Sequence, residues 1–225
     1  MPPFEQPVLY PTMTFQAAIF DMDGLLLDTE RLCMRIFKEA CAVQNLPFFE
    51  DVYLSIIGRN SVGIERIFRK AYGDDLDRLD AEWRVRYHGV VRNEPIPIKE
   101  GVVELLSWLK SNDIPTAVAT STVNDVARRK LELAGLDKYF DALATGCEVK
   151  NGKPDPEIFL LAANRLEVNP ATCLAFEDSN NGVRSAVAAN MITYQIPDLV
   201  QPDDEVRALG HRVMPSMVQV LESLR

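Results

Sequence analysis

Short apolar runs alternate with segments of helical periodicity along most of this chain, and this alternation constrains the fold more than any other feature. The runs show little polar alternation, which is typical of strands that are buried on both faces. They predict strands over residues 16–20, 116–119, 142–145, 173–176 and 192–196. The segments between the later runs predict helices over residues 100–111, 124–134 and 182–189, and a further helix that opens at Asp155. Strand–helix alternation of this kind indicates a parallel sheet with helices on both faces.

The first strand is separated from the others by a long helical block. From Thr29 to Asn93 apolar residues recur at helical spacing and no strand is evident. The block ends at Pro95 and Pro97, which make a non-helical boundary. We therefore predict an α/β fold, a Rossmann-like parallel sheet whose core domain comprises residues 15–28 and 97–225. Residues 29–96 are predicted to form an inserted α-helical cap domain, and the proline-rich residues 1–14 an N-terminal tail.

The balance of charge excludes one large class of partner. The 225 residues contain 33 Asp and Glu against 24 Lys and Arg, for a formal net charge of −9. Binding to a phosphate backbone needs a cationic face, so the composition argues against a nucleic-acid partner. No apolar run approaches the length of a membrane span. With no signal peptide visible and with cysteines too widely spaced for a zinc site, these features predict a cytoplasmic protein with reduced thiols.

The first candidate site follows the first predicted strand. In an open parallel sheet, ligands bind beyond the carboxyl ends of the strands. Asp21 and Asp23 stand at such an end, and Gly24 turns the chain away. Two close carboxylates repel each other unless a cation lies between them or one of them holds a proton. One interpretation makes one carboxylate a nucleophile for phosphorus and the other a general acid and base; the alternative is a solvated turn.

Three more strand ends carry polar residues of complementary chemistry. Glu177 and Asp178 form a second acidic pair, which suits Mg²⁺ coordination and equally suits capping of the next helix. Thr120 and Ser121 precede a helix, where hydroxyl and N–H groups bind phosphate oxygens or cap the helix. Lys153 would place a positive charge on a rigid loop near these acids, where a cation balances charge.

These four segments together resemble the four signature motifs of the haloacid dehalogenase-like hydrolases. The segments begin at Phe20, Val118, Gly152 and Phe176 and read FDMDGLLLDTE, VATS, GKPDPEIF and FEDSNNG. The resemblance spans residues 16–197 and is to the branch with a helical cap inserted after the first motif. That branch contains β-phosphoglucomutases and small sugar-phosphate and nucleotide phosphatases.

The resemblance implies a role for each motif residue. Asp21 would be the nucleophile that forms an aspartyl-phosphate, and Asp23 would be the general acid and base. The implied phosphate-binding residues are Thr120, Ser121 and Lys153. The implied ligands of a Mg²⁺ cofactor are Asp21, Asp23 (also through its carbonyl group), Glu177 and Asp178. These roles agree with phosphoryl-transfer chemistry, which depends on positioning and on neutralisation of the phosphoryl oxygens.

Within the family, particular positions favour a phosphatase. Asp23 argues against a dehalogenase, because by resemblance those enzymes lack an acid there and use no Mg²⁺. β-Phosphoglucomutases carry a histidine at the position of Cys33 and an arginine near Ser61, and neither is present here. We therefore predict a Mg²⁺-dependent phosphatase that hydrolyses a small phosphate monoester, a sugar phosphate or a nucleotide-like compound. The alternatives are a β-phosphoglucomutase-type phosphosugar mutase and a non-catalytic protein that binds phosphorylated ligands.

The cap is expected to select the substrate, because it closes over the site and contacts the leaving group. The cap residues expected to face the site are Glu30, Cys33, Met34, Arg59 and Asn60, a mixture that fits a small polar alcohol. We expect the partner to be a small phosphorylated metabolite, neither a nucleic acid nor a membrane. We expect the protein to be a monomer or a weak homodimer.

Overall fold

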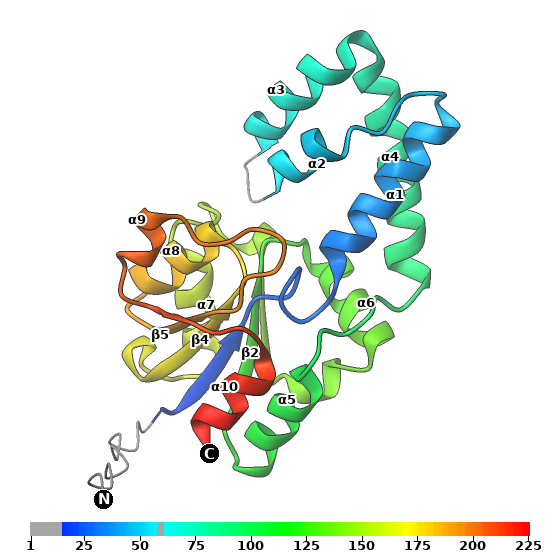
Figure 1. Cartoon of the computed structure of the whole chain (residues 1–225). Coiled ribbons are helices and arrows are strands. Elements are labelled where there is room, and N and C mark those ends of the chain that lie inside the picture. Colours follow the sequence, from blue (N-terminus) through cyan, green and yellow to red (C-terminus); the bar gives the residue numbers. More distant parts are fainter. Residues whose placement is uncertain (1–14, 58–60) are drawn as a thin grey trace, which may run out of the picture.

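The computed structural model describes residues 15–57 and 61–225, and its centre is a six-stranded sheet (Figure 1). The strands are β1 (Ala17–Phe20), β2 (Thr116–Thr120), β3 (Ala142–Thr145), β4 (Cys173–Glu177), β5 (Ile192–Gln195) and β6 (Arg212–Val213). Their order across the sheet is β3-β2-β1-β4-β5-β6, and every pairing is parallel. The predicted α/β class is confirmed, and β1 lies in the middle of the sheet between β2 and β4.

Helices cover both faces of the sheet, because successive side chains of a strand point to opposite faces. Ala18 and Phe20 of β1 pack in one apolar cluster with residues of α5 (Val102–Ser111), α6 (Asn124–Ala134) and α10 (Met217–Leu224). Ala17 and Ile19 pack in a second cluster with residues of α7 (Glu157–Arg165) and α8 (Asn180–Ala188). The uninterrupted apolar sequence of β1 therefore reflects burial on both sides.

A block of four helices lies between β1 and α5 in the sequence and stands to one side of the sheet (Figure 1). The helices are α1 (Thr29–Val43), α2 (Glu50–Ile56), α3 (Ser61–Tyr72) and α4 (Leu76–Asn93). The block has its own aromatic core, in which Phe37 stacks on Phe68 and meets Trp83 edge-on. The chain segments that enter and leave the block run side by side, since Leu27 and Ile98 form an antiparallel bridge.

Several element boundaries differ from the predicted ones, and a side-chain cap explains one of them. The helices predicted from residues 100 and 182 begin at Val102 and Asn180. Ser179 caps α8, since its Oγ accepts the N–H of Gly182 at 3.0 Å, so the helix begins before the glycine. The helix predicted to open at Asp155 begins at Glu157, whose N–H donates to Asp155 Oδ1 at 3.0 Å.

The C-terminal part of the chain contains elements that the sequence did not predict. These are β6, α9 (Asp204–Arg207) and α10. The first two are two and four residues long, too short to show a periodic pattern. Four short 3₁₀ turns complete the described chain: Gly73–Asp75, Asp137–Tyr139, Gly146–Glu148 and Pro170–Thr172. The predicted tail over residues 1–14 lies outside the described residues.

None of the helices within residues 15–57 and 61–225 has both the length and the apolar character of a membrane span.

Candidate active site

The polar strand ends converge on one cavity at the carboxyl edge of the sheet. The cavity has a volume of about 470 Å³. Eight of the residues singled out from the sequence line it: Asp21, Asp23, Glu30, Cys33, Thr120, Ser121, Lys153 and Asp178. Glu177 is fully buried beside it, whereas Arg59 and Asn60 lie outside the described residues. The structure thus brings together all four predicted motif segments, as expected for the ends of neighbouring parallel strands.

Gly24 allows two of these segments to approach closely. Its φ of +90° lies in the left-handed region that favours glycine. A Cβ at this position would lie 2.4 Å from Oδ2 of Asp178, which is shorter than the contacts that Cβ atoms make in proteins. The N–H of Asp21 also donates to the carbonyl of Phe176 at 2.9 Å, which ties the end of β1 to β4. The positive φ and the proximity of Asp178 together favour glycine after the two aspartates.

Lys153 is the buried cation of the site. Its side chain is 7% exposed, and Nζ donates to Asp21 Oδ1 at 2.5 Å and to Glu177 Oε1 at 2.6 Å. A third bond reaches the carbonyl of Ala119 at 2.9 Å, so all three ammonium protons have acceptors. Burial opposes the charged form, but the two carboxylates outweigh it and raise the pKa of Lys153 above its ordinary value. The lysine therefore stays protonated at the floor of the cavity.

One lysine does not balance the acids around it. Asp21, Glu177 and Asp178 each offer a carboxylate oxygen, and these oxygens lie within 4.8 Å of one another. Burial raises the pKa of Asp21 to about 7 against the attraction of Lys153, with added repulsion from Glu177 and Asp23. Burial and the negative charges of Glu177 and Asp21 raise the pKa of Asp178 well above its ordinary value. Oxygen donors with surplus negative charge are the environment that a hard divalent cation such as Mg²⁺ prefers.

Glu177 differs from the other acids because its carboxylate is already bonded on both oxygens. Oε1 accepts from Lys153, and Oε2 accepts the backbone N–H and the hydroxyl of Ser179 at 3.2 and 3.1 Å. A Cβ at Gly182 would lie 1.9 Å from the Glu177 carboxyl carbon, so only glycine fits there. Glu177 therefore orients Lys153 and the loop after β4, in addition to contributing charge near Asp178.

Asp23 is held by donors on both of its oxygens. Oδ1 accepts from Lys130 Nζ at 2.7 Å, and Oδ2 accepts from Thr122 Oγ1 at 2.6 Å. Thr120 Oγ1, predicted to bind phosphate, donates weakly to the same Oδ2 at 3.4 Å and accepts the N–H of Thr122. Burial would raise the pKa of Asp23, but the ion pair and hydrogen bond with Lys130 hold it below its ordinary value. In this arrangement Asp23 is an ionised carboxylate.

Lys130 was not identified from the sequence, although its position on a helix indicates a residue of the site. It lies on α6 among Val126, Ala127 and Leu131, all buried at helical spacing. A lysine on the apolar face of an amphipathic helix is unusual, because a buried ammonium group needs a partner. That pattern could have marked Lys130 as a residue of the site.

The helical block contributes mostly apolar side chains to the lining of the cavity. Glu30 and Cys33 line it as predicted, but Met34 packs instead in the core of the block. The other lining residues of the block are Tyr53, Ile56, Ile57, Ile64 and Trp83. Apolar side chains at helical spacing therefore serve both the core of the block and the cavity.

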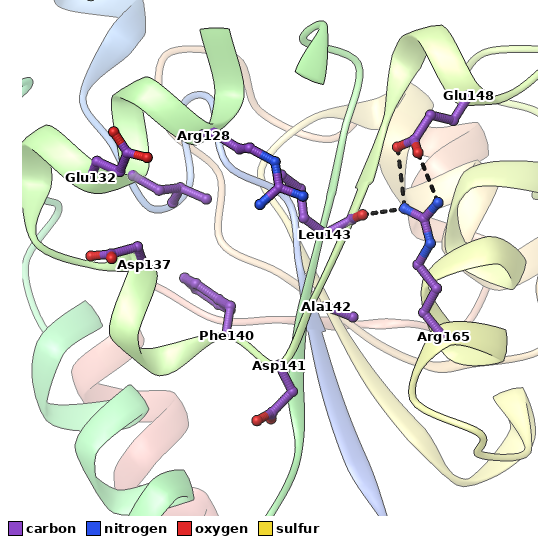
Figure 2. A pocket seen from close by; sticks show the side chains of 10 residues that line it. Arg128, Glu132, Asp137, Phe140, Asp141, Ala142, Leu143, Glu148 and Arg165 are labelled. Atoms are coloured by element: carbon purple, nitrogen blue, oxygen red, sulfur yellow. Dashed lines mark hydrogen bonds and ion pairs between the residues drawn. The ribbon is translucent and has the colours of Figure 1, made fainter. Parts of the chain in front are cut away.

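A second cavity, of about 570 Å³, lies at β3, the edge strand of the sheet (Figure 2). It contains none of the residues singled out from the sequence. Its ordered feature is a two-bond ion pair, in which Arg165 donates to both carboxylate oxygens of Glu148 at 2.7 and 3.2 Å. Glu148 also accepts the N–H and hydroxyl of Thr145, which completes a capping box at the end of β3. The Arg165–Glu148 ion pair in this cavity therefore stabilises the fold, and it leaves neither side chain free for catalysis.

Replacing Glu148 with glutamine should destabilise the protein without changing its activity. The bonds from Arg165 and Thr145 lower the pKa of Glu148 to about 2, so its ionised form stabilises the fold above its ordinary pKa of 4.5. We expect Glu148→Gln to lower the free energy of unfolding by about 1–2 kcal/mol at neutral pH. The loss should shrink as the pH falls from 4.5 toward 2, because the wild-type carboxylate then becomes neutral.

Urea unfolding of both proteins across this pH range checks the result. Glu132→Gln is the matched control, because Glu132 lines the same cavity but is 54% exposed and reaches Arg129 only at 3.6 Å. A loss that is independent of pH, or equal in the control, would contradict the assignment.

Comparisons with known proteins agree on one family. A family model described as "haloacid dehalogenase-like hydrolase" matches residues 15–190. A phosphorylated carbohydrates phosphatase of Thermotoga maritima is 38% identical over 181 residues, covering 78% of this chain and 82% of that protein. A fructose-1-phosphate phosphatase of Escherichia coli is 32% identical over 181 residues, covering 79% of this chain and 94% of that protein.

A solved structure extends the similarity to the three-dimensional level. It is that of a Thermotoga maritima protein whose assignment as a β-phosphoglucomutase is provisional. The two chains share 33% identity and superpose with a TM-score of 0.79, covering 93% of this chain and 98% of the other. The similarity therefore includes the helical block as well as the sheet.

Proposed function

The chain belongs to the haloacid dehalogenase-like hydrolase family and is a phosphoric monoester hydrolase, and we propose that it hydrolyses a small phosphorylated metabolite through an aspartyl-phosphate on Asp21. The observation that carries this proposal is the buried contact between Lys153 and Asp21. It leaves one carboxylate oxygen of Asp21 for attack and places a positive charge where the phosphoryl group would lie. The substrate class that fits is a sugar phosphate or a nucleotide-like monoester.

The proposed reaction has two steps. In the first, a carboxylate oxygen of Asp21 bonds to phosphorus while the bond from phosphorus to the alcohol oxygen breaks. Asp23 is ionised in the free protein, so it must take up a proton before this step, and it then donates that proton to the alcohol oxygen. In the second, Asp23 takes a proton from a water molecule that attacks the phosphorus. The bond between phosphorus and Asp21 then breaks, which releases inorganic phosphate and restores the carboxylate. Ser121 and Thr120, at the end of β2, would donate to the phosphoryl oxygens.

Mg²⁺ fits the acidic cluster. Asp21 and Asp178 would hold it directly, with the Asp23 carbonyl and Glu177 completing its surroundings. The surplus negative charge that raises the pKa of Asp21 and Asp178 supports this assignment. When bound, the ion would neutralise charge on the phosphoryl oxygens.

We further propose that residues 29–96 act as a cap that binds the leaving group. Glu30, on α1, offers a hydrogen-bond acceptor to a hydroxyl group. The indole N–H of Trp83, which also lines the cavity, is buried and has no hydrogen-bond partner among the described residues. The surrounding isoleucines and Tyr53 would contact an apolar face of the alcohol.

Removal of the metal tests the proposed function. We expect inorganic phosphate to be released with Mg²⁺ from a panel of sugar phosphates, nucleoside monophosphates and 4-nitrophenyl phosphate. Chelation with EDTA should lower the rate by at least about 100-fold, and excess Mg²⁺ should restore it. Because the pKa of Asp21 is raised to about 7, protons should compete with the metal, and more Mg²⁺ should be needed as the pH falls below that value. Absence of release from the whole panel with Mg²⁺ present would refute the proposal.

Product analysis separates a phosphatase from a mutase. The mutase alternative is supported by the similarity to the Thermotoga maritima structure and to a β-phosphoglucomutase from Clostridium difficile, at 25% identity and a TM-score of 0.70. From β-glucose 1-phosphate a phosphatase yields glucose and inorganic phosphate. Glucose 6-phosphate as the main product would overturn our choice.

A further inference from the structure

A buried lysine links the proposed general acid to the helical block. Lys130 on α6 is 1% exposed, and its Nζ lies 2.7 Å from Asp23 Oδ1 and 2.9 Å from the hydroxyl of Tyr87 on α4. The same Nζ lies 5.4 Å from the centre of the Tyr87 ring. Resting on the proposed function, we propose that Lys130 is a positioning residue that fixes the carboxylate of Asp23, and that Tyr87 couples it to the helical block.

The positioning role follows from the bonds of Asp23. Lys130 holds one oxygen and Thr122 holds the other, so the carboxylate cannot rotate freely about its bond to Cβ. Proton transfer to a leaving oxygen requires the acid within hydrogen-bond distance and in line, and small misplacements are costly. Removal of Lys130 would take away the ion pair and the 2.7 Å hydrogen bond that hold Oδ1. The main expected loss is therefore in delivery of the proton, and not in binding of the phosphate.

The coupling role follows from where Tyr87 lies. It belongs to α4 of the helical block, whereas Lys130 and Asp23 belong to segments that pack on the sheet. One turn before Tyr87, Trp83 lines the candidate active-site cavity. A second link between α4 and α6 is the contact of Arg92 with Asp125 at 3.0 Å. A shift of α4 relative to α6 would therefore change the contact between Tyr87 and Lys130 and, through Lys130, the position of the Asp23 carboxylate.

Two aryl esters that differ in leaving group test the proposal. 4-Nitrophenolate departs from phosphorus without a proton, whereas the more basic phenolate needs proton donation. We expect Lys130→Met to lower kcat/KM for phenyl phosphate by about 100-fold and for 4-nitrophenyl phosphate by less than about 10-fold. Tyr87→Phe, which keeps the ring and the Lys130–Asp23 pair, should show the same selectivity with a loss of about 3–10-fold for phenyl phosphate. Arg128→Met, an exposed position on the same helix, should leave both values unchanged.

Each outcome decides a different point. If the wild type hydrolyses both esters and Lys130→Met loses activity equally on both, the positioning role is wrong and the proposed function stands. If the wild type hydrolyses neither ester with Mg²⁺ present, the proposed function and the inference fail together. If circular dichroism shows that Lys130→Met does not fold, Tyr87→Phe is the deciding variant. Wild-type values of kcat/KM for both esters in Tyr87→Phe would then overturn the coupling role.

Discussion

Replacing Asp21 with asparagine is expected to lower kcat by at least about 10⁴-fold, because the amide cannot form the aspartyl-phosphate. Asparagine has nearly the same shape, and Lys153 keeps its bonds to Glu177 and to the carbonyl of Ala119. The loss should therefore come from chemistry and not from misfolding. Phosphate release from the best substrate of the panel measures it, and Asp137→Asn, an exposed position, is the matched control.

The same variant has a second readout in stability. A carboxyl group whose pKa is raised in the folded state stabilises the fold only while it is neutral, and this contribution is lost as the pH rises. For Asp21 the contribution is present below the ordinary value of 3.8 and is lost as the pH rises to about 7. In EDTA, Asp21→Asn should therefore gain in stability relative to wild type as the pH rises through this window.

The activity of the variant has its own criterion. Turnover by Asp21→Asn above one hundredth of the wild-type rate would contradict a nucleophilic role for Asp21.

The location of the site could be predicted from the sequence, because parallel strands bring their carboxyl ends to one edge of the sheet. Asp21, Thr120 and Asp178 each follow or end an apolar run, and that position alone placed them together. Gly24 and Gly182 were visible as motif residues. Their physical reason, the proximity of a carboxylate to each Cα, became visible only with the packing of the loops.

The direction of side chains could not be predicted, because it depends on contacts between segments far apart in the chain. Glu177 was expected beside a metal, and it lies in the acidic cluster with Asp21 and Asp178, but its bonds to Lys153 and Ser179 were not expected. Lys130 reaches Asp23 across 107 positions of sequence, which no local pattern encodes. The apolar lining of the cavity was also hidden, because Ile64 and Trp83 have the helical spacing of ordinary core residues.

Replacing Lys153 with methionine is expected to affect both activity and stability. Methionine fills similar space but leaves Asp21 and Glu177 buried without their cation. Loss of one partner from a buried ion pair costs about 3–5 kcal/mol of unfolding free energy, and loss of the cation should lower kcat by about 10³-fold. Urea unfolding in EDTA and phosphate release with Mg²⁺ measure the two effects. Lys150→Met, an exposed position in the same loop, should change neither.

A double variant separates the two roles of Lys153. Adding Glu177→Gln removes one of the two anions that the lysine neutralises, so part of the lost stability should return. Activity should not return, because the phosphoryl group and Asp21 would still lack the cation between them. If the double variant regains stability alone, Lys153 acts on the substrate as well as on the fold. If turnover also returns, the lysine serves only to neutralise Glu177, and its proposed contact with phosphate is wrong.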